Sequence, residues 1–102
     1  MQPFTPRIDA TVSITVTASN VTVALPDSRR AVDIRIHNDD TQTVFISSGD
    51  SSAAASTSTG IPIPAGAVEV LRFPPVSGLR YMAAIGTAAN SRKIYFVAGH
   101  GI

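Results

Sequence analysis

The stretch TVSITVTASNVTVAL, residues 11–25, decides the fold class of this chain. Val, Ile and Leu alternate with Ser, Thr or Ala in two runs, one centred on Ile14 and the other on Val23. A period of two carried by β-branched residues is typical of strands with one buried face. Residues 18–20, Ala-Ser-Asn, separate the runs and suit a short hairpin turn, because Asn tolerates the left-handed conformation. The stretch therefore predicts two strands joined as a hairpin.

Further along the chain the same alternation recurs at regular spacing. In AVDIRIHN, residues 31–38, the Val and Ile side chains are predicted to face inward and the polar ones, Asp33 among them, to face solvent. No segment has helical apolar spacing over ten residues. The chain is therefore predicted to be all-β, a single-domain β-sandwich or jelly roll of about seven to eight short antiparallel strands. The remaining strand candidates are TVFIS (43–47), AVEVLRF (67–73), LRYMAAIG (79–86) and RKIYFVAG (92–99).

Composition narrows the class of protein. The 102 residues suit one domain, with 44% hydrophobic and only 15% charged residues, where a quarter charged is usual. A net charge of +1 gives no electrostatic footprint for nucleic acid and no polybasic membrane patch. The absence of cysteine excludes disulfides and thiolate metal sites. With no signal-peptide pattern at the start and no run of about 20 apolar residues, we expect a soluble chain.

Residues 1–10 are predicted to form an extended N-terminal arm ahead of a β-sandwich domain at 11–102. Pro3 and Pro6 fix the backbone and remove two donors. Phe4 lies between them, and burying its ring is worth about 1.5–3 kcal/mol. Two readings remain open: Phe4 covers the edge of its own domain, or the arm docks on a neighbouring subunit.

The segment 48–60, SGDSSAAASTSTG, is predicted to be a long loop. It has no aromatic or branched aliphatic side chain and cannot form a core of its own. Ile61 and Ile63 follow it, alternating with prolines that hold the backbone extended, and Gly66 permits the turn into the next strand. The loop is either a flexible surface segment or a neutral surface that packs against another subunit without desolvating charge.

Candidate chemical groups do not assemble into a catalytic pattern. His37, Asp39 and Asp40 are close in sequence and have metal-ligating groups, but Asn-Asp-Asp after a strand is an ordinary polar turn. His100 lacks an evident partner, and no serine lies in a G-x-S-x-G context. Asp27, Asp33 and Glu69, the candidates for paired carboxylates, fall at a turn and on predicted solvent faces. We therefore expect no enzyme activity, no metal and no cofactor.

Two pairs of surface residues are candidates for recognition. Arg29 and Arg30 follow the turn at Pro26, where adjacent arginines suit either a solvated loop or the rim of an interface. Tyr81 and Tyr95 lie on late strands and would be the platform for stacking a sugar. With 6% aromatic residues and no Trp, the chain has little material for a carbohydrate-binding face.

Three stretches, taken in order, resemble a group of small structural proteins of tailed-phage and prophage virions. They are VDIRIHNDDTQTVFISSGD (32–50), IPIPAGAVEVLRF (61–73) and KIYFVAGHGI (93–102). The shared order is a strand of apolar, Thr and aromatic residues, a small-residue loop, a PIPAG-V-E-V segment and a terminal G-x-G-I. The resemblance covers about residues 31–102 and includes no catalytic motif.

This resemblance implies a non-enzymatic virion protein, most specifically a head decoration (cement) protein that binds and stabilises the capsid. Its partners would be the major capsid protein or other virion proteins, with a homo-oligomer, a trimer favoured, and without nucleic acid or membrane. Its location would be the virion, assembled in the host bacterial cytoplasm. The alternatives are a tail, neck or fibre component, or a module that binds host glycan. The expected subunit or capsid contacts are Phe4, Arg7, Arg29, Arg30, Ser52, Thr57, Ile61 and Ile63.

Overall fold

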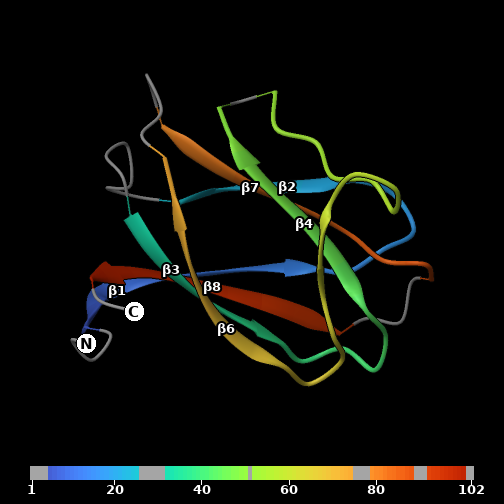
Figure 1. Cartoon of the computed structure of the whole chain (residues 1–102), viewed down its shortest axis with the longest axis horizontal. Coiled ribbons are helices and arrows are strands. Elements are labelled where there is room, and N and C mark those ends of the chain that lie inside the picture. Colours follow the sequence, from blue (N-terminus) through green and yellow to red (C-terminus); the bar gives the residue numbers. More distant parts are fainter. Residues whose placement is uncertain (1–4, 26–31, 51, 75–78, 89–91, 101–102) are drawn as a thin grey trace.

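The computed structural model describes residues 5–25, 32–50, 52–74, 79–88 and 92–100, and Figure 1 shows its two layers of strands. The all-β prediction is confirmed, and no helix in these ranges is long and apolar enough to cross a membrane. The strands are β1 (Thr5–Thr15), β2 (Val21–Leu25), β3 (Val32–Asn38), β4 (Val44–Gly49), β5 (Ile61–Ile63), β6 (Val68–Phe73), β7 (Arg80–Ile85) and β8 (Lys93–His100).

The strands form two four-stranded antiparallel sheets with a simple pairing rule. The first sheet has the order β1-β8-β3-β6 and the second sheet the order β2-β7-β4-β5. Strand β1 pairs with β8, β2 with β7, β3 with β6 and β4 with β5. The chain is thus one long antiparallel ribbon, with its far end at β4 and β5, rolled up so that its pairs alternate between the two layers. This arrangement is the eight-stranded jelly roll.

The predicted hairpin at residues 11–25 is wrong. Val12 of β1 pairs with Phe96 of β8, whereas Val23 of β2 pairs with Met82 of β7 in the other sheet. Residues 16–20 cross between the layers. Alternation identifies which face of a strand is buried but not its partner, and two walls of one core give the same pattern as two strands of one hairpin.

The core fills the space between the sheets, and the predicted inward faces of β1, β2 and β3 are confirmed. The sheets bury the alternate residues of each strand against one another, as the period of two requires. Val12, Val21, Val23, Ala67 and Leu71 pack on the core as partly buried neighbours. The buried cluster is Ile14, Val16, Leu25, Ile34, Ile36, Val44, Ile46, Ile63, Phe73, Met82, Ala84, Ile94, Phe96 and Ala98.

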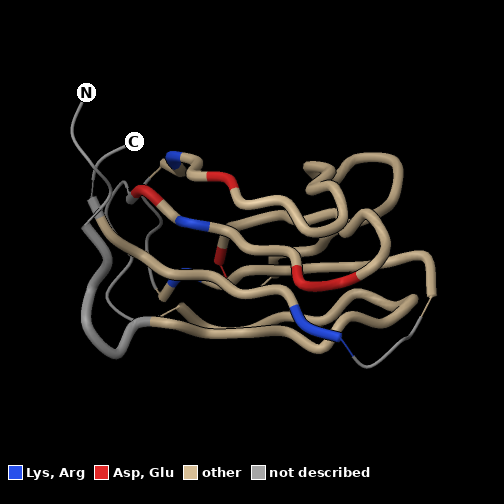
Figure 2. The backbone as a smooth tube through the Cα atoms, turned by 90° about the horizontal axis from the view of Figure 1, so that it is seen from below, with Lys and Arg blue, Asp and Glu red and all other residues tan. Residues whose placement is uncertain are grey.

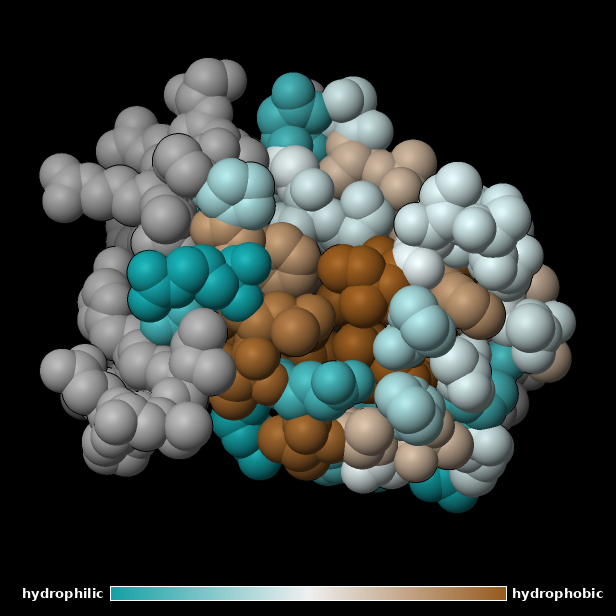
Figure 3. Space-filling model, in the orientation of Figure 1, coloured by the Kyte–Doolittle hydropathy of each residue, from teal (hydrophilic) through white to brown (hydrophobic). Residues whose placement is uncertain are grey.

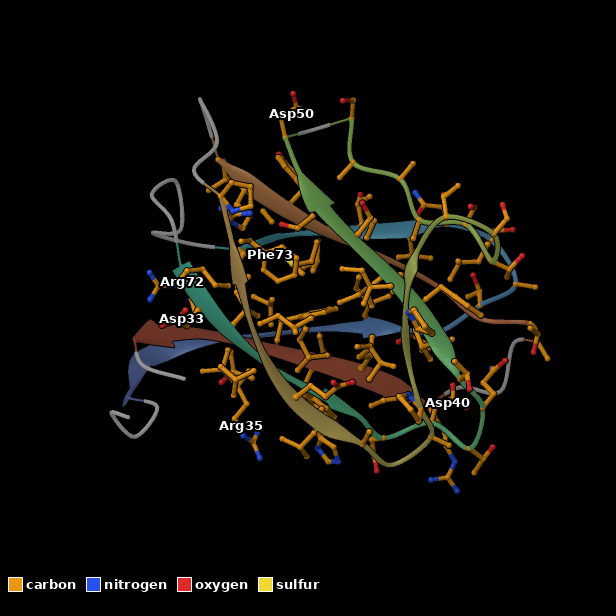
Figure 4. The ribbon with its side chains drawn as sticks, in the orientation of Figure 1. Asp33, Arg35, Asp40, Asp50, Arg72 and Phe73 are labelled. Atoms are coloured by element: carbon orange, nitrogen blue, oxygen red, sulfur yellow. The ribbon has the colours of Figure 1, made fainter. Side chains whose placement is uncertain are left out.

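Asp33 departs from the predicted pattern, because it is buried rather than solvent-facing. Its carboxylate accepts hydrogen bonds from Arg72 Nε at 2.8 Å and Arg72 Nη2 at 3.0 Å, across the β3–β6 ladder. Figure 4 shows the two side chains side by side. The hydrogen bonds to Asp33, and then the attraction of its charge, raise the pKa of Arg72. The exposed guanidinium covers the carboxylate, so a charged residue is buried on the outer face.

The N-terminal segment is partly strand. Strand β1 begins at Thr5, which pairs with His100, while Pro6 pairs with Gly99; the register then shifts before Thr11. Proline is tolerated here because β1 is an edge strand. Residues 5–10 of the expected arm therefore extend β1 along β8, and Phe4 lies outside the described residues.

A tight turn joins β5 to β6 and sets the position of β6. Ala67 N–H donates to Pro64 O at 3.0 Å, and Gly66 has a φ of 72°, as a type II turn requires. Gly66 N–H donates to Asn38 O at 2.9 Å, and Asn38 N–H donates to Ala67 O at 3.0 Å. Two residues thus oppose one, which is a β-bulge with glycine at its first position. The predicted role of Gly66 in this turn is confirmed.

Candidate functional site

The Ser- and Ala-rich loop at 48–60 packs on the outer face of its own sheet. Ala55 is buried, and its N–H donates to Asn20 Oδ1 at 2.8 Å, next to β2. A Cβ on Gly60 would lie 2.8 Å from Phe45 Cβ and 3.3 Å from Ile46 N, so the loop also touches β4. Since β7 lies between β2 and β4, the loop crosses β7.

The ends of the loop are held by local hydrogen bonds. Asp50 Oδ1 accepts from Ser52 N–H at 2.9 Å and from Ser52 Oγ–H at 2.5 Å. Thr59 N–H donates to Ser56 Oγ at 3.0 Å, and Gly60 N–H donates to Ser56 O at 2.9 Å. The expected contact residues Ser52 and Thr57 are both exposed on this loop. The small side chains therefore serve first to bring the loop close to its own sheet.

Replacing Asn20 by Ala is expected to loosen this packing. The change leaves the Ala55 N–H without its acceptor, which costs about 1 kcal/mol. We expect faster hydrogen exchange at the Ala55 amide and a small loss of stability in urea unfolding. Ser19→Ala is the matched control, since the exposed Ser19 hydroxyl takes no part in the contact. Unchanged exchange at Ala55 in Asn20→Ala would show that the loop is held by other contacts.

The start of the loop is expected to depend on pH through Asp50. The Ser52 hydroxyl, and then the Ser52 N–H, lower the pKa of Asp50 by donating to its carboxylate. A lowered folded-state pKa means that the stabilisation is present above the unfolded pKa and is lost as pH falls through the folded one. The Ser52 amide resonance should therefore titrate with a midpoint below that of an unstructured Asp. Asp50→Asn should abolish the transition, and a midpoint at or above the ordinary value would contradict the contact.

The acidic turn after β3 is a structural network. Asp40 is buried, and its carboxylate accepts from Thr41 N–H at 2.6 Å and from Gln42 N–H at 3.2 Å. His37 stacks on Tyr95, with 6.1 Å between ring centroids, and Asp39 is exposed. No group of three or more His, Cys, Asp or Glu placed to hold a metal occurs within the described ranges. The carboxylates of Asp33, Asp40 and Asp50 lie far apart in Figure 4.

Gln42 ties this turn to the loop after β7. Its Oε1 accepts from Thr87 N–H at 2.7 Å, from Thr87 Oγ–H at 2.8 Å and from Ala88 N–H at 3.1 Å. Its Nε2 donates to Ala88 O at 2.6 Å. Asp40 Oδ2 is also within 3.4 Å of Gln42 Nε2. These bonds join the two loops at one end of the sandwich. They occupy both the oxygen and the nitrogen of the Gln42 amide, which are therefore engaged within the fold.

Arg80, the first residue of β7, is buried between the two sheets. It has the inward alternation of Met82 and Ala84, and it is almost completely buried. Its Nη1 donates to Ser48 Oγ at 2.7 Å, its Nη2 donates to Pro74 O, and its Cζ lies 5.8 Å from the centre of the Phe73 ring. Burial lowers the pKa of Arg80. Ser48 thus accepts from a structural guanidinium.

The two tyrosines do not form one platform. Tyr95 pairs with His37 and Ser13 in the first sheet, whereas Tyr81 pairs with Ala24 and Gly49 in the second. Each lies on a strand position opposite to the buried residues beside it, so each faces outward from a different layer. A sugar-stacking face would have to use one of them without the other.

The side of the sandwich formed by β5 and β6 exposes apolar surface. Strands β5 and β6 are the last strands of their sheets on this side, and Figure 3 shows apolar side chains gathered over and between them. Ile61 is 41% exposed and Val68 is 48% exposed, while Leu71 is partly buried against the core. We call Ile61, Val68, Val70 and Leu71, with Glu69 among them, the β5–β6 surface.

The expected contact residues are distributed unevenly with respect to this surface. Ile61 lies on it, but Ile63 is fully buried, because it pairs with Val44 and faces the core. The expectation that Ile63 contacts a partner is therefore wrong. Arg7 belongs to β1, on the other side of the sandwich. Phe4, Arg29 and Arg30 lie outside the described residues.

Sequence reasoning missed β6 as part of this surface. It placed Glu69 on a solvent face opposite to its neighbours, but the register pairs Glu69 with Ile36, whose side chain is in the core. Val68 and Val70 therefore both lie on the outer face. The signal was present in VEVLRF, where apolar residues occupy both alternate sets. Such a pattern indicates a strand with apolar side chains on both faces.

Comparison of the chain with protein-family models, with curated proteins and with solved structures gives no match.

Proposed function

We propose that the chain is a non-enzymatic structural protein of a phage virion, most specifically a head decoration protein that binds and stabilises the capsid. The observation that carries the proposal is the β5–β6 surface. Ile61 and Val68 are exposed there, on edge strands of a rigid sandwich. Exposed apolar side chains at the edge of a sandwich favour docking on another protein.

The architecture supports the same role. Eight-stranded jelly rolls recur in viral capsid proteins and in lectins, an analogy at the level of fold alone. The resemblance of residues 31–102 to small virion proteins favours the first of these. In Figure 2 most of the backbone belongs to uncharged residues, and the charges of both signs are scattered along it. A largely neutral body can be held in an assembly without desolvating many charges.

As a mechanism, the jelly roll supplies the rigid body and the β5–β6 surface supplies the contact with the capsid. Copies joined as a homo-oligomer, a trimer favoured, would bind several capsid subunits at once, so that weak contacts add through multivalency. Native mass spectrometry near physiological salt tests this part. A discrete trimer or other closed ring supports it, and a monomer at all concentrations would require that copies assemble only on the particle.

The proposal is tested by locating the chain in purified particles. Virions of the encoding phage or prophage are purified on density gradients, separated into heads and tails, and analysed by mass spectrometry. We expect the chain in the head fraction, in a fixed ratio to the major capsid protein. Its presence in tails alone would favour the tail, neck or fibre alternative. Its absence from both fractions would overturn the proposal and favour a module that binds host glycan.

A further inference from the structure

The outer edge of β6 presents backbone that no strand of the described residues pairs with. Strand β6 pairs with β3 alone in the described part of the chain. The hydrogen bonds of Asn38 with Gly66 and Ala67 show which residues of the β3–β6 pair face each other with their peptide groups. In an antiparallel pair, alternate residues carry the hydrogen bonds, so Glu69, Leu71 and Phe73 bond to β3. The peptide groups of Val68, Val70 and Arg72 therefore point away from the sheet.

Apolar side chains lie on both sides of this edge. On the outer face, Val68 is 48% exposed and Val70 is partly buried. On the inner face, Leu71 is partly buried, and Ile61 of β5 is 41% exposed. A strand paired with β6 would satisfy the three outward peptide groups and would cover these side chains at the same time. Unpaired edges of this kind are templates for an added strand.

The charge of Glu69 indicates which side chain an added strand would carry opposite it. Glu69 is on the inner face with Leu71, yet it is exposed and has no ion-pair partner among the described residues. Arg72 is on the outer face and is engaged by Asp33. Among the described residues of β6, the charged group without an ion-pair partner is therefore a carboxylate, and it lies on the inner face. A cationic side chain placed opposite Glu69 would complement it.

A second copy of β6 would leave Glu69 without a cationic partner. Three registers of a two-fold antiparallel pairing bring at least two of Val68, Val70 and Arg72 opposite these residues of the second copy. One register places Glu69 directly opposite its symmetry mate, and another places it opposite Leu71 with the second Glu69 diagonal to it. The third places Glu69 opposite Phe73. Like charges directly opposite destabilise a sheet pair, and none of the registers gives Glu69 a cation.

We propose that β6 binds an extended segment of the partner protein as an added strand, with a Lys or Arg of that segment opposite Glu69 between apolar residues. This inference rests on the proposed docking role and specifies how the partner is held. Main-chain hydrogen bonds to Val68, Val70 and Arg72 give the register. Apolar contacts with Leu71 and Ile61 add affinity, and Glu69 gives specificity.

Two capped synthetic peptides test the inference on the full chain. TVTKTVT places Lys between two Val on one face, and TVTETVT differs only at the central residue, where Glu reverses the charge. Binding is followed by amide chemical shifts of the isotope-labelled protein. We expect TVTKTVT to shift and protect the amides of Val68, Val70 and Arg72, and TVTETVT to bind about threefold more weakly. Glu69→Lys should reverse that order, and an unchanged order in this variant would overturn the assignment.

A backbone variant separates strand addition from side-chain contact. Val70→Pro removes an outward N–H that β3 does not use, and proline is tolerated at such edge positions. It should keep the dispersed spectrum of the folded chain and lose peptide binding at least tenfold. Val70→Thr is the matched control, because it keeps the N–H and the β-branched shape. Equal binding by Val70→Pro and the unchanged chain would overturn strand addition.

Other results also decide the question. Peptide-induced shifts confined to β1 or β2 would place the binding edge on the opposite side and overturn the inference. Concentration-dependent shifts of Val68 and Val70 without peptide would show that a second copy occupies the edge, with the same consequence. Peptide binding at β6 by a chain that is absent from virions would leave this inference standing and remove the proposed function. If the Val70→Pro variant bound phage heads as fully as the unchanged chain, the proposed function would stand and strand addition at β6 would be overturned.

Discussion

Replacing Asn38 by Ala is expected to lower the free energy of unfolding by about 3–4 kcal/mol. Asn38 is fully buried. Its Nδ2 lies 3.0 Å from Gln42 O, 2.9 Å from Ile63 O and 3.2 Å from Pro64 O, and its Oδ1 accepts from Asp40 N–H at 2.9 Å. Truncation would leave these groups unpaired away from water.

Equilibrium unfolding in urea measures this loss, and Asn38→Asp is the control of nearly equal shape. The Asp variant keeps an acceptor for the Asp40 N–H but loses the Nδ2 donor and turns a carboxylate toward three carbonyls. It should be at least as unstable as Asn38→Ala at neutral pH and should recover part of the loss in acid, where a protonated carboxyl can donate. A loss below about 1 kcal/mol in Asn38→Ala would contradict the central role of this side chain.

Replacing Gly86 by Ala is expected to destabilise the fold by about 2–3 kcal/mol through overpacking. A Cβ at Gly86 would lie 2.6 Å from Val16 Cγ1 and 2.9 Å from both Gln42 Cδ and Gln42 Nε2. Val16 is fully buried, and Gln42 is held by Thr87 and Ala88. Val16 cannot move without disturbing the core, and Gln42 cannot move without breaking its hydrogen bonds to Thr87 and Ala88.

Gly49→Ala is the matched control for Gly86→Ala. A Cβ at Gly49 would lie 3.7 Å from Ala53 Cβ, an ordinary contact. We expect a change in unfolding free energy within about 0.5 kcal/mol there. Thermal unfolding followed by circular dichroism compares the two variants. Equal melting temperatures would contradict the close approach of Val16 and Gln42 to Gly86.

The strands were predictable because their information is local. The alternation around Ile14, Val23 and Ile34 depends only on which face of each strand is buried, and the structure buries those faces. Partner choice depends on contacts between distant segments, so the same alternation gave a hairpin at residues 18–20 where the chain instead crosses between sheets.

Asp33 was predicted to face solvent and is buried, and Arg80, whose orientation was not predicted, is buried as well. Asp33 is covered by Arg72, and Arg80 is buried on Phe73 with Ser48 as an acceptor. No local pattern identifies such partners, because each is tens of residues away or belongs to another strand. Glu69 is the converse case: its alternation is inward, but its edge position leaves it exposed.

The candidate surface was only partly predictable for a related reason. Ile61 was expected at a contact and is exposed, whereas Ile63, two residues on, is buried against β4. The long loop was expected to face solvent or a neighbour, but its Ala55 packs on its own sheet. Exposure at the edge of a sandwich depends on the order of the strands in each sheet, which the sequence pattern does not encode.

Hydrogen exchange of the chain, free and bound to purified phage heads, tests the docking role of β6 most directly. In the free chain we expect slow exchange at the amides of Glu69, Leu71 and Phe73, and fast exchange at Val68, Val70 and Arg72. On the particle these three fast amides should slow at least tenfold. Unchanged exchange at all three, with protection elsewhere on the bound chain, would contradict the account.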